Sequence, residues 1–293
     1  MTARFGDRLE AAFGRFGQLC VGIDPHDTIL RAWDLPDDAA GAREFALRIV
    51  DAAAGRVGLV KPQVAFFERF GAAGYVVLEE VIASARSQDL LVIADAKRGD
   101  VGSTVDSYAR TWIGEGSPLE SDAMTLSAFQ GVGSLERALE RAERAGKGVF
   151  VLAATSNPEG VASQQATVGS GARAGMTVAA GIVADVVEWN QSQVGPGRGA
   201  PGRFGSAGVV LGATLEPSGF GIRLSALTPP PGTPVLAPGF GHQGASLDSL
   251  EKTFGVAAPQ VIVTASRSIA TAGARGVGDE ISRHGREVGR WRG

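Results

Sequence analysis

Leu-Leu-Val-Ile-Ala-Asp-Ala-Lys-Arg-Gly-Asp, residues 90–100, is an apolar run that ends abruptly in charged side chains. The apolar part predicts a buried strand, in which residues i and i+2 point to the same face. Asp95 and Lys97 are therefore expected to project side by side from the end of a strand that otherwise belongs to the core, and Asp100 follows closely along the chain. An acid–base–acid cluster held on a rigid element is a common way to build a proton-transfer site.

Short apolar runs of this kind recur along the whole chain, separated by helical patterns. Strands are expected at 18–24, 57–62, 89–95, 122–127, 148–155, 208–214, 234–238 and 260–265. Helices are expected between most of them, including Ala42–Ala54, Ala73–Ser87, Val105–Glu115, Ser134–Ala145 and Val178–Asn190. Eight strand–helix units with near-continuously apolar strands predict a (β/α)8 TIM barrel, formed by residues 1–293 as a single domain. A doubly wound open sheet is the alternative, but no Gly-x-Gly-x-x-Gly turn follows the first strand.

The expected strands share a further feature, because polar side chains follow many of them at their C-terminal ends. These are Asp24, Lys61, Asp95 with Lys97, Thr155-Ser156-Asn157, the segment 238–244 and Ser266-Arg267-Ser268. A single charge at such a place can simply mark the point where a strand meets water. The whole set around one mouth instead predicts an active site, since barrel enzymes place their chemistry at this face.

Composition excludes several classes of protein. The 293 residues carry 28 Lys and Arg against 31 Asp and Glu, so no basic excess indicates a nucleic-acid partner. No apolar stretch reaches the ~18 residues of a membrane span, and the N-terminus lacks the apolar core of a signal peptide, so a cytoplasmic protein is expected. Cys20, the single cysteine, lies in an apolar strand-like run and is expected to be a buried, inert thiol.

The charged residues near the third strand predict proton transfer rather than imine chemistry. Lys61, Asp95, Lys97 and Asp100 are expected to form an array of alternating charge. Each opposite charge favours the ionised form of its neighbour, so the lysines stay cationic. A class I aldolase needs a lysine with a depressed pKa, whereas a lysine flanked by carboxylates is a proton donor.

Metal sites find little support in the sequence. Three histidines and one cysteine show no zinc-ligand spacing. Asp95 and Asp100 could hold Mg²⁺, but the intervening Lys97 and the nearby Arg98 make a divalent cation there less favourable.

Phosphate binding is expected after the seventh and eighth strands, where barrels commonly hold such a group. Arg267 can grip a phosphate through two parallel hydrogen bonds, and Gln243 lies among glycines. Backbone amides around Gly241 and Gly244 could add donors.

Two further segments are expected to be irregular. The Gly/Pro-rich stretch 195–208, before the sixth strand, is expected as a mobile connection rather than a lid, and 228–234 as a stiff connector into the seventh strand.

The segment from Asp95 to Thr104 resembles the signature of the orotidine 5′-phosphate decarboxylase family, and the longer, actinobacterial-like branch of that family is the most similar. Further matching segments are Val21–Pro25, Val60–Glu68, Ala154–Pro158, Gly212–Thr214, Pro238–Gly244 and Ser266-Arg267. The chain departs from the family pattern at Val101, where isoleucine is common, at 126–131, and at 195–208, which has no clear counterpart.

The resemblance implies removal of CO₂ from orotidine 5′-monophosphate to give uridine 5′-monophosphate, in a (β/α)8 barrel that uses no metal or organic cofactor. It implies that Lys97 protonates C6 of the pyrimidine. Asp95, Asp100 and Lys61 would complete the array. The remaining roles it implies are Asp24 and Lys61 at the ribose, Ser156 at the pyrimidine, Gln243 and Arg267 at the phosphate, and Asp100 with Thr104 reaching into the partner's site of a homodimer.

Besides a class I aldolase that uses Lys97, which the charge pattern disfavours, two alternatives stay open. One is a Mg²⁺-dependent sugar-phosphate decarboxylase or lyase, which shares an Asp-x-Lys strand end. The presence of Lys61, Arg98 and Asp100 together argues against it. The other is a catalytically silent barrel that binds a nucleotide, which an intact charged array makes improbable.

Overall fold

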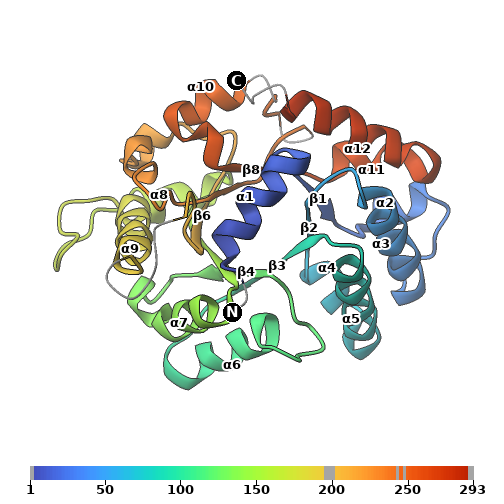
Figure 1. Ribbon diagram of the computed structural model, residues 1–293, viewed down its shortest axis with the longest axis horizontal. Coiled ribbons are helices and arrows are strands. Elements are labelled where there is room, and N and C mark those ends of the chain that lie inside the picture. Colours follow the sequence, from blue (N-terminus) through green and yellow to red (C-terminus); the bar gives the residue numbers. More distant parts are fainter. Residues whose placement is uncertain (1–2, 195–201, 242–243, 247–248, 290–293) are drawn as a thin grey trace.

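The computed structural model describes residues 3–194, 202–241, 244–246 and 249–289. Within these ranges eight parallel strands close into a barrel in the order β1 to β8, and β8 pairs again with β1. Figure 1 shows the helices arranged around these strands. The (β/α)8 architecture predicted from the alternation of strands and helices is confirmed.

Each apolar run of the sequence forms a strand, with ends that differ from the expected ones by a few residues. The strands are β1 Leu19–Ile23, β2 Leu59–Pro62, β3 Leu91–Arg98, β4 Ala123–Ser127, β5 Gly148–Ala154, β6 Ala207–Leu211, β7 Val235–Ala237 and β8 Val261–Ala265. All residues of β1, β2, β6, β7 and β8 are buried. Burial on both faces explains why these runs lack the polar alternation of a half-exposed strand.

The helices that were expected between strands are also present. The longer ones are α1 Phe5–Phe16, α3 Ala39–Ala53, α5 Gly71–Ser87, α6 Gly102–Ile113, α7 Glu136–Ala145, α9 Val178–Ser192 and α12 Gly273–Gly289. The short α-helices are α2 Asp27–Ala32, α4 Ala65–Glu68, α8 Val161–Gln164, α10 Leu250–Phe254 and α11 Arg267–Ala270. Single 3₁₀ turns are η1 Val132–Leu135, η2 Pro158–Gly160, η3 Pro217–Phe220, η4 Leu224–Leu227 and η6 Gly255–Gln260.

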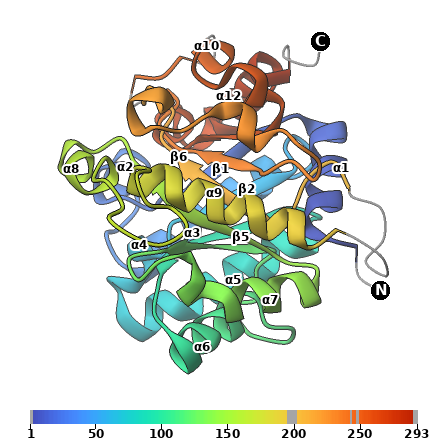
Figure 2. The ribbon, with the colours of Figure 1, turned by 90° about the vertical axis from the view of Figure 1, so that its left-hand side faces the viewer.

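Helix α1, which was not expected from the sequence, closes the N-terminal end of the barrel. Its apolar residues Phe5, Leu9 and Phe13 join one buried cluster with side chains that point into the barrel interior. Phe5 packs edge-on against Phe150 of β5, with ring centroids 5.9 Å apart. Figure 2 shows α1 and α8 at opposite ends of the molecule. Because α1 fills one end, the hollow available for chemistry lies at the C-terminal end of the strands.

The Gly/Pro-rich stretch 195–208 is only partly described, since residues 195–201 lie outside the described ranges. Its described part is packed. Phe204 is buried against Phe13 of α1, with ring centroids 5.6 Å apart. The amide of Gly205 donates to the carbonyl of Gly232 at 2.8 Å, within the expected connector 228–234. Residues 207 and 208 already belong to β6. Residues 202–208 are therefore packed against the barrel, and mobility of the connection stays a prediction.

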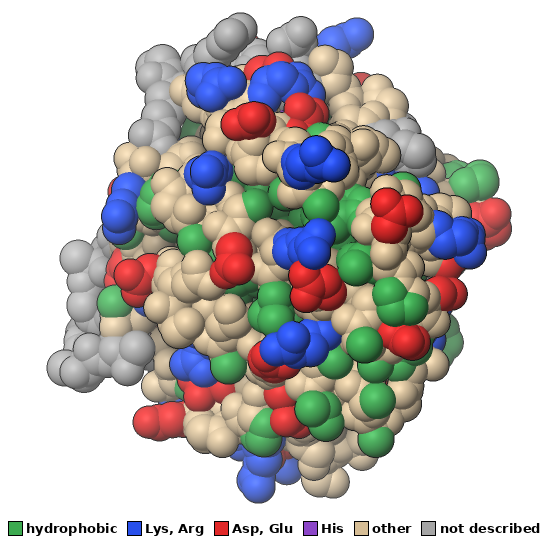
Figure 3. All heavy atoms as spheres, turned by 90° about the vertical axis from the view of Figure 1, so that its right-hand side faces the viewer, with side chains coloured by type: hydrophobic (Ala, Val, Ile, Leu, Met, Phe, Trp, Pro, Cys, Tyr) green, Lys and Arg blue, Asp and Glu red, His purple; other side chains and the backbone are tan. Residues whose placement is uncertain are grey.

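The outer surface carries charges of both signs. Figure 3 shows basic and acidic side chains interspersed over one side of the molecule. Several form ion pairs between neighbouring helices, such as Arg43 of α3 with Glu80 of α5. In the described ranges, none of the helices has the length and apolar character needed to cross a membrane.

Candidate active site

A hollow of about 290 Å³ opens at the C-terminal end of the barrel strands. One side of it is charged and is formed by the ends of β1 to β3, which supply Asp24, Lys61, Asp95 and Lys97. The other side is apolar and is formed by Leu152, Val210, Leu236, Pro238 and Phe240. The mouth predicted from the strand ends therefore exists, and it has two chemically different walls.

Asp95 lies at the centre of the charged wall. Its Oδ2 accepts a hydrogen bond from Lys61 Nζ at 2.9 Å, and its Oδ1 accepts one from Lys97 Nζ at 2.6 Å. Gln63 Nε2 also donates to Oδ2, and the hydroxyl of Thr125 donates to Oδ1, both at 2.9 Å. The carboxylate is thus fixed by four donors, two of them cationic.

Electrostatics keep this cluster charged. Burial alone would raise the pKa of Asp95, but the charges of Lys61 and Lys97 and their hydrogen bonds outweigh it and hold that pKa well below its usual range. Burial lowers the pKa of Lys61, whereas Asp95 and Asp24 raise it, and the net shift is upward. Asp95 is therefore an anion and Lys61 a cation at neutral pH, which agrees with the charge pattern expected from the sequence.

Lys97 differs from Lys61 in its access to the hollow. The Lys97 side chain is 44% exposed, whereas that of Lys61 is 8% exposed. The backbone of Lys97 has a φ of 48°, in the left-handed region that costs a non-glycine residue about 1–2 kcal/mol. This turn at the end of β3 folds the ammonium back onto Asp95 while leaving it reachable from the opening.

Gln63 and Thr125 were not among the expected site residues. Gln63 follows Lys61 by two positions, so the same i, i+2 rule that paired Asp95 with Lys97 predicts its orientation. Its backbone pairs with that of Asp95 in an isolated bridge. Thr125 comes from β4 and is fully buried. A buried hydroxyl near a charged strand end is the signal that could have indicated it, because buried polar groups need partners.

Asp24 and Arg267 face the hollow from other sides. Asp24 Oδ1 is buried without a hydrogen-bond partner, so this oxygen is available to a ligand hydroxyl. Arg267 begins α11 directly after β8 and is exposed at the mouth. Within the described ranges it makes no ion pair, so its guanidinium can receive an anion.

The turn after β7 contains two of the glycines near which phosphate donors were expected, Gly241 and Gly244. The amide of Gly241 donates to the carbonyl of Ala245 at 2.9 Å, and the amide of Gly244 donates to the carbonyl of Gly241 at 3.0 Å. Both amides are used within the turn, and a role of backbone amides around these glycines at a phosphate stays a prediction. Gln243 lies outside the described residues.

Three expected site residues do not line the hollow. Ser156 is exposed beside it, next to Gly212, and the neighbouring Thr155 lines the wall instead. Asp100 Oδ1 accepts from the amide of Val101 at 2.7 Å, and Asp100 makes no ion pair with any residue of the described part of the chain. Thr104 is exposed in the first turn of α6. One chain therefore brings Lys61, Asp95 and Lys97 together, without Asp100.

The positive charge of Arg98 was expected to disfavour a divalent cation beside Asp95 and Asp100. Arg98 forms its ion pair elsewhere. It turns outward, where it pairs with Glu68 of α4 and lies 6.0 Å from the ring centroid of Tyr108. Among the residues that are described, no three His, Cys, Asp or Glu side chains gather as metal ligands. Both oxygens of Asp95 already accept hydrogen bonds from ammonium groups, which leaves this carboxylate poorly suited to a cation.

Cys20 lies beneath the charged wall, inside the barrel, and is buried as expected. Burial raises the pKa of its thiol to about 12. A protonated thiol of this kind is not a nucleophile at neutral pH.

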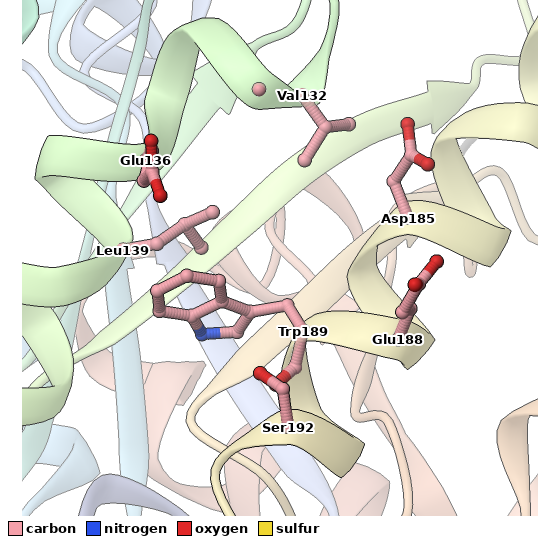
Figure 4. A pocket seen from close by; sticks show the side chains of 8 residues that line it. Val132, Glu136, Leu139, Asp185, Glu188, Trp189 and Ser192 are labelled. Atoms are coloured by element: carbon pink, nitrogen blue, oxygen red, sulfur yellow. The ribbon is translucent and has the colours of Figure 1, made fainter. Parts of the chain in front are cut away.

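A second hollow lies on the flank of the barrel between α7 and α9. Figure 4 shows Leu139 and Glu136 of one helix facing Trp189, Asp185 and Glu188 of the other. Arg173 already pairs with both Asp185 and Glu188. This hollow takes no residue from the strand ends, so it is separate from the charged cluster.

Comparisons with known proteins agree on one family. The model of the orotidine 5′-phosphate decarboxylase / HUMPS family matches residues 17–277. Curated orotidine 5′-phosphate decarboxylases of Corynebacterium efficiens and of a Nocardioides species are 45% and 46% identical over 274 and 265 residues, which cover 93% and 90% of this chain and 92% and 91% of those proteins. A crystal structure from Streptomyces avermitilis is 41% identical, with a TM-score of 0.89 over 98% of this chain and 95% of that one. Leishmania donovani OMP decarboxylase is 27% identical, with a TM-score of 0.73 over 98% of this chain and 99% of that one.

Substitution of Asp95 by asparagine tests the buried ion pair. The variant leaves the Lys61 ammonium buried without its counter-charge, so we expect Asp95→Asn to lower the free energy of unfolding by about 3–5 kcal/mol at pH 7. Asp95 has a depressed pKa in the folded state, so its contribution is complete above the unfolded-state pKa of about 3.9 and is lost as the pH falls further. The difference between variant and wild type, measured by urea denaturation, should be constant from about pH 5 to 8 and shrink below about pH 4. Equal stabilities at pH 7 would contradict this reading.

Proposed function

Since the chain belongs to the orotidine 5′-phosphate decarboxylase / HUMPS family, we propose that it removes CO₂ from orotidine 5′-monophosphate to give uridine 5′-monophosphate, with Lys97 as the proton donor to C6. This reaction is the last step of de novo pyrimidine synthesis. The observation that carries the proposal is the array of Lys61, Asp95 and Lys97 at the mouth of the barrel. The proposal treats residues 1–293 as one barrel domain.

The array suits a reaction that leaves negative charge on carbon. When the bond between C6 and the carboxylate breaks, its electron pair stays on C6 and neutral CO₂ leaves. A fixed ammonium beside C6 stabilises that developing charge more than it stabilises the substrate, which lowers the barrier. Lys97 Nζ then transfers a proton to C6 and, being partly exposed, regains one from solvent.

The two walls of the hollow contact different parts of the substrate. The apolar side of Leu152, Val210 and Leu236 accommodates groups without charge, namely one face of the pyrimidine and the departing CO₂. The charged side holds the ribose through Asp24 and Lys61. The unpartnered Oδ1 of Asp24 supports this assignment, because a ribose hydroxyl would satisfy it.

The phosphate and the base are assigned to the rim. We infer that Arg267 and Gln243 hold the phosphate, and the exposed guanidinium of Arg267 at the mouth supports this role. Ser156 is assigned to the pyrimidine. Because Ser156 lies beside the hollow and not in it, the segment after β5 has to close over the ligand for this contact to form.

The proposed assembly is a homodimer with shared sites, to which Asp100 and Thr104 of each subunit contribute across the interface. Asp100 has no ion-pair partner among the described residues of its own chain, which fits a role elsewhere. Two large apolar side chains are exposed, that of Val101, the next residue in the chain, by 52% and that of Phe129, which follows β4, by 92%, as expected for a surface that another subunit covers. The proposal includes a cytoplasmic location and no nucleic-acid or membrane partner.

The Mg²⁺-dependent lyase and the silent nucleotide-binding barrel fit this site less well than the decarboxylase. A Mg²⁺-dependent lyase would need free carboxylate oxygens, whereas both oxygens of Asp95 accept hydrogen bonds from lysines. A silent nucleotide-binding barrel would have no need for the strained turn that presents Lys97. The proposed chemistry uses no metal or organic cofactor.

Turnover of orotidine 5′-monophosphate tests the proposal directly. We expect the pure protein to decrease the substrate's ultraviolet absorbance equally with and without EDTA. Lys97→Ala should lower kcat by a factor on the order of 10³ or more while uridine 5′-monophosphate still binds, because a general acid is lost and the binding groups are kept. Lys252→Ala, which changes an exposed lysine of α10, is the control. Near-wild-type kcat in Lys97→Ala would overturn the proton-donor role, and sensitivity to EDTA would favour the lyase.

Removal of the Arg267 guanidinium tests the phosphate assignment. Arg267→Ala should raise the Kd for uridine 5′-monophosphate about 10- to 100-fold, because it removes charge-assisted hydrogen bonds. The Kd for uridine, which lacks the phosphate, should change little. Arg286→Ala, an exposed arginine of α12, should leave both unchanged. If titration calorimetry shows equal losses for nucleotide and nucleoside, the assignment is wrong.

Subunit mixing tests the shared site. Lys97→Ala and Asp100→Ala homodimers should each be inactive. A mixed dimer would contain one doubly altered site and one intact site, so a randomised mixture should regain about a quarter of the wild-type activity. Native mass spectrometry verifies that mixed dimers have formed. Mixed dimers without activity would refute the contribution of Asp100 across the interface.

A further inference from the structure

Thr125 of β4 lies behind the charged wall and has two hydrogen bonds that link it to the proposed proton donor. The backbone amide of Lys97 donates to Thr125 Oγ1 at 2.9 Å, and Thr125 Oγ1 donates to Asp95 Oδ1, also at 2.9 Å. The side chain of Thr125 is fully buried and does not line the hollow, so it does not itself contact a ligand there.

Chemistry fixes the direction of both bonds. A backbone amide can only donate, so the hydroxyl accepts from Lys97. The single proton of the hydroxyl is then directed to Asp95, because the ionised carboxylate can only accept. Lys97 Nζ donates to the same oxygen, Asp95 Oδ1, at 2.6 Å. Both ends of Lys97, its backbone amide and its ammonium, are therefore held through one hydroxyl and one carboxylate oxygen.

The pairing of β3 with β4 explains why a side chain takes this position. Ala94 pairs with Met124 and Arg98 pairs with Leu126, so β3 advances four residues while β4 advances two. The extra residues on β3 form a bulge opposite Thr125, and the amide of Lys97 leaves the regular ladder. The hydroxyl of Thr125 supplies the acceptor that the ladder no longer provides, next to the left-handed turn at Lys97 with φ 48°.

We propose that Thr125 is a positioning residue, which holds the backbone of Lys97 in its left-handed turn and thereby aims the ammonium at the reacting carbon. The inference rests on the proposed role of Lys97 as proton donor. Without the hydroxyl, the amide of Lys97 loses its acceptor and the strained turn relaxes, which moves the ammonium away from Asp95. Gln63 also donates to Asp95, but to Oδ2, the oxygen that accepts from Lys61, and not to Oδ1, the oxygen that accepts from Lys97.

The test compares Thr125→Val, which replaces the hydroxyl by a methyl group, with Thr125→Ser, which keeps it. A displacement of about 1 Å at a catalytic group can reduce a rate on the order of 10²-fold, so kcat of Thr125→Val should fall about 10- to 100-fold. KM and the Kd for uridine 5′-monophosphate should change less than about threefold, because the binding groups stay in place. Thr125→Ser should restore kcat to near the wild-type value.

Thr233→Val is the matched control for stability. Thr233 is buried just before β7, and its hydroxyl accepts a hydrogen bond from Asn190 at 3.0 Å, away from the hollow. It should lose thermal stability to a similar extent as Thr125→Val while keeping kcat. Equal kcat in Thr125→Val and wild type would overturn the inference and leave the decarboxylase assignment intact.

A crystal structure of Thr125→Val decides the positioning role independently of turnover. We expect the φ of Lys97 to leave the positive range and its Nζ to lie beyond hydrogen-bond reach of Asp95 Oδ1. An unchanged Lys97 would overturn the inference. A wild-type protein that does not turn over orotidine 5′-monophosphate would instead refute the proposed function, and the crystallographic comparison would still decide whether Thr125 positions Lys97.

Discussion

A single buried carboxylate ties together the C-terminal ends of three strands. Asp95 of β3 receives hydrogen bonds from Lys61 and Gln63 at the end of β2, from Thr125 of β4 and from Lys97 of its own strand. A buried anion is costly unless it is paired and fully hydrogen-bonded, so each of these contacts compensates the burial of Asp95. The same contacts fix the ammonium groups of Lys61 and Lys97 in space. Asp95 is thus both a buried anion that needs these cations and the group that positions them for the proposed reaction.

Helix α1 closes the end of the barrel opposite the site, and the packed interior restricts the positions of the site side chains. Helix α1 fills the N-terminal end with Phe5, Leu9 and Phe13, and the interior beneath the site is apolar and closely packed. Side chains that stand on a closed barrel of parallel strands have little freedom, which is the condition for a pre-organised charge array. The strain at Lys97 persists because its surroundings hold it on both sides, and such strain is typical of functional positions.

Much of this site could be predicted from the sequence, because the relevant rules are local. Apolar runs alternating with helical patterns predict the barrel, and the i, i+2 rule places Asp95 and Lys97 on one face. The 2.6 Å contact between them depends on the bulge opposite Thr125 and the positive φ of Lys97, which no local pattern of residues 90–100 indicates. The pairing of Arg98 with Glu68 and the packing of α1 against the strands also depend on contacts between segments far apart in sequence. Propensity and spacing contain no information about such contacts.

The central claim is that Asp95 is an anion clamped between two cations, and the most direct measurement is the titration of its side-chain carboxyl carbon by NMR. Labelled protein would be followed from pH 8 down to about pH 3.5, with the resonance assigned by its absence in an Asp95→Asn spectrum. The depressed pKa of Asp95 predicts the chemical shift of an ionised carboxylate over this whole range, without a titration step. A step near pH 4, the range of an ordinary aspartate, or a protonated carboxyl at neutral pH would contradict the account.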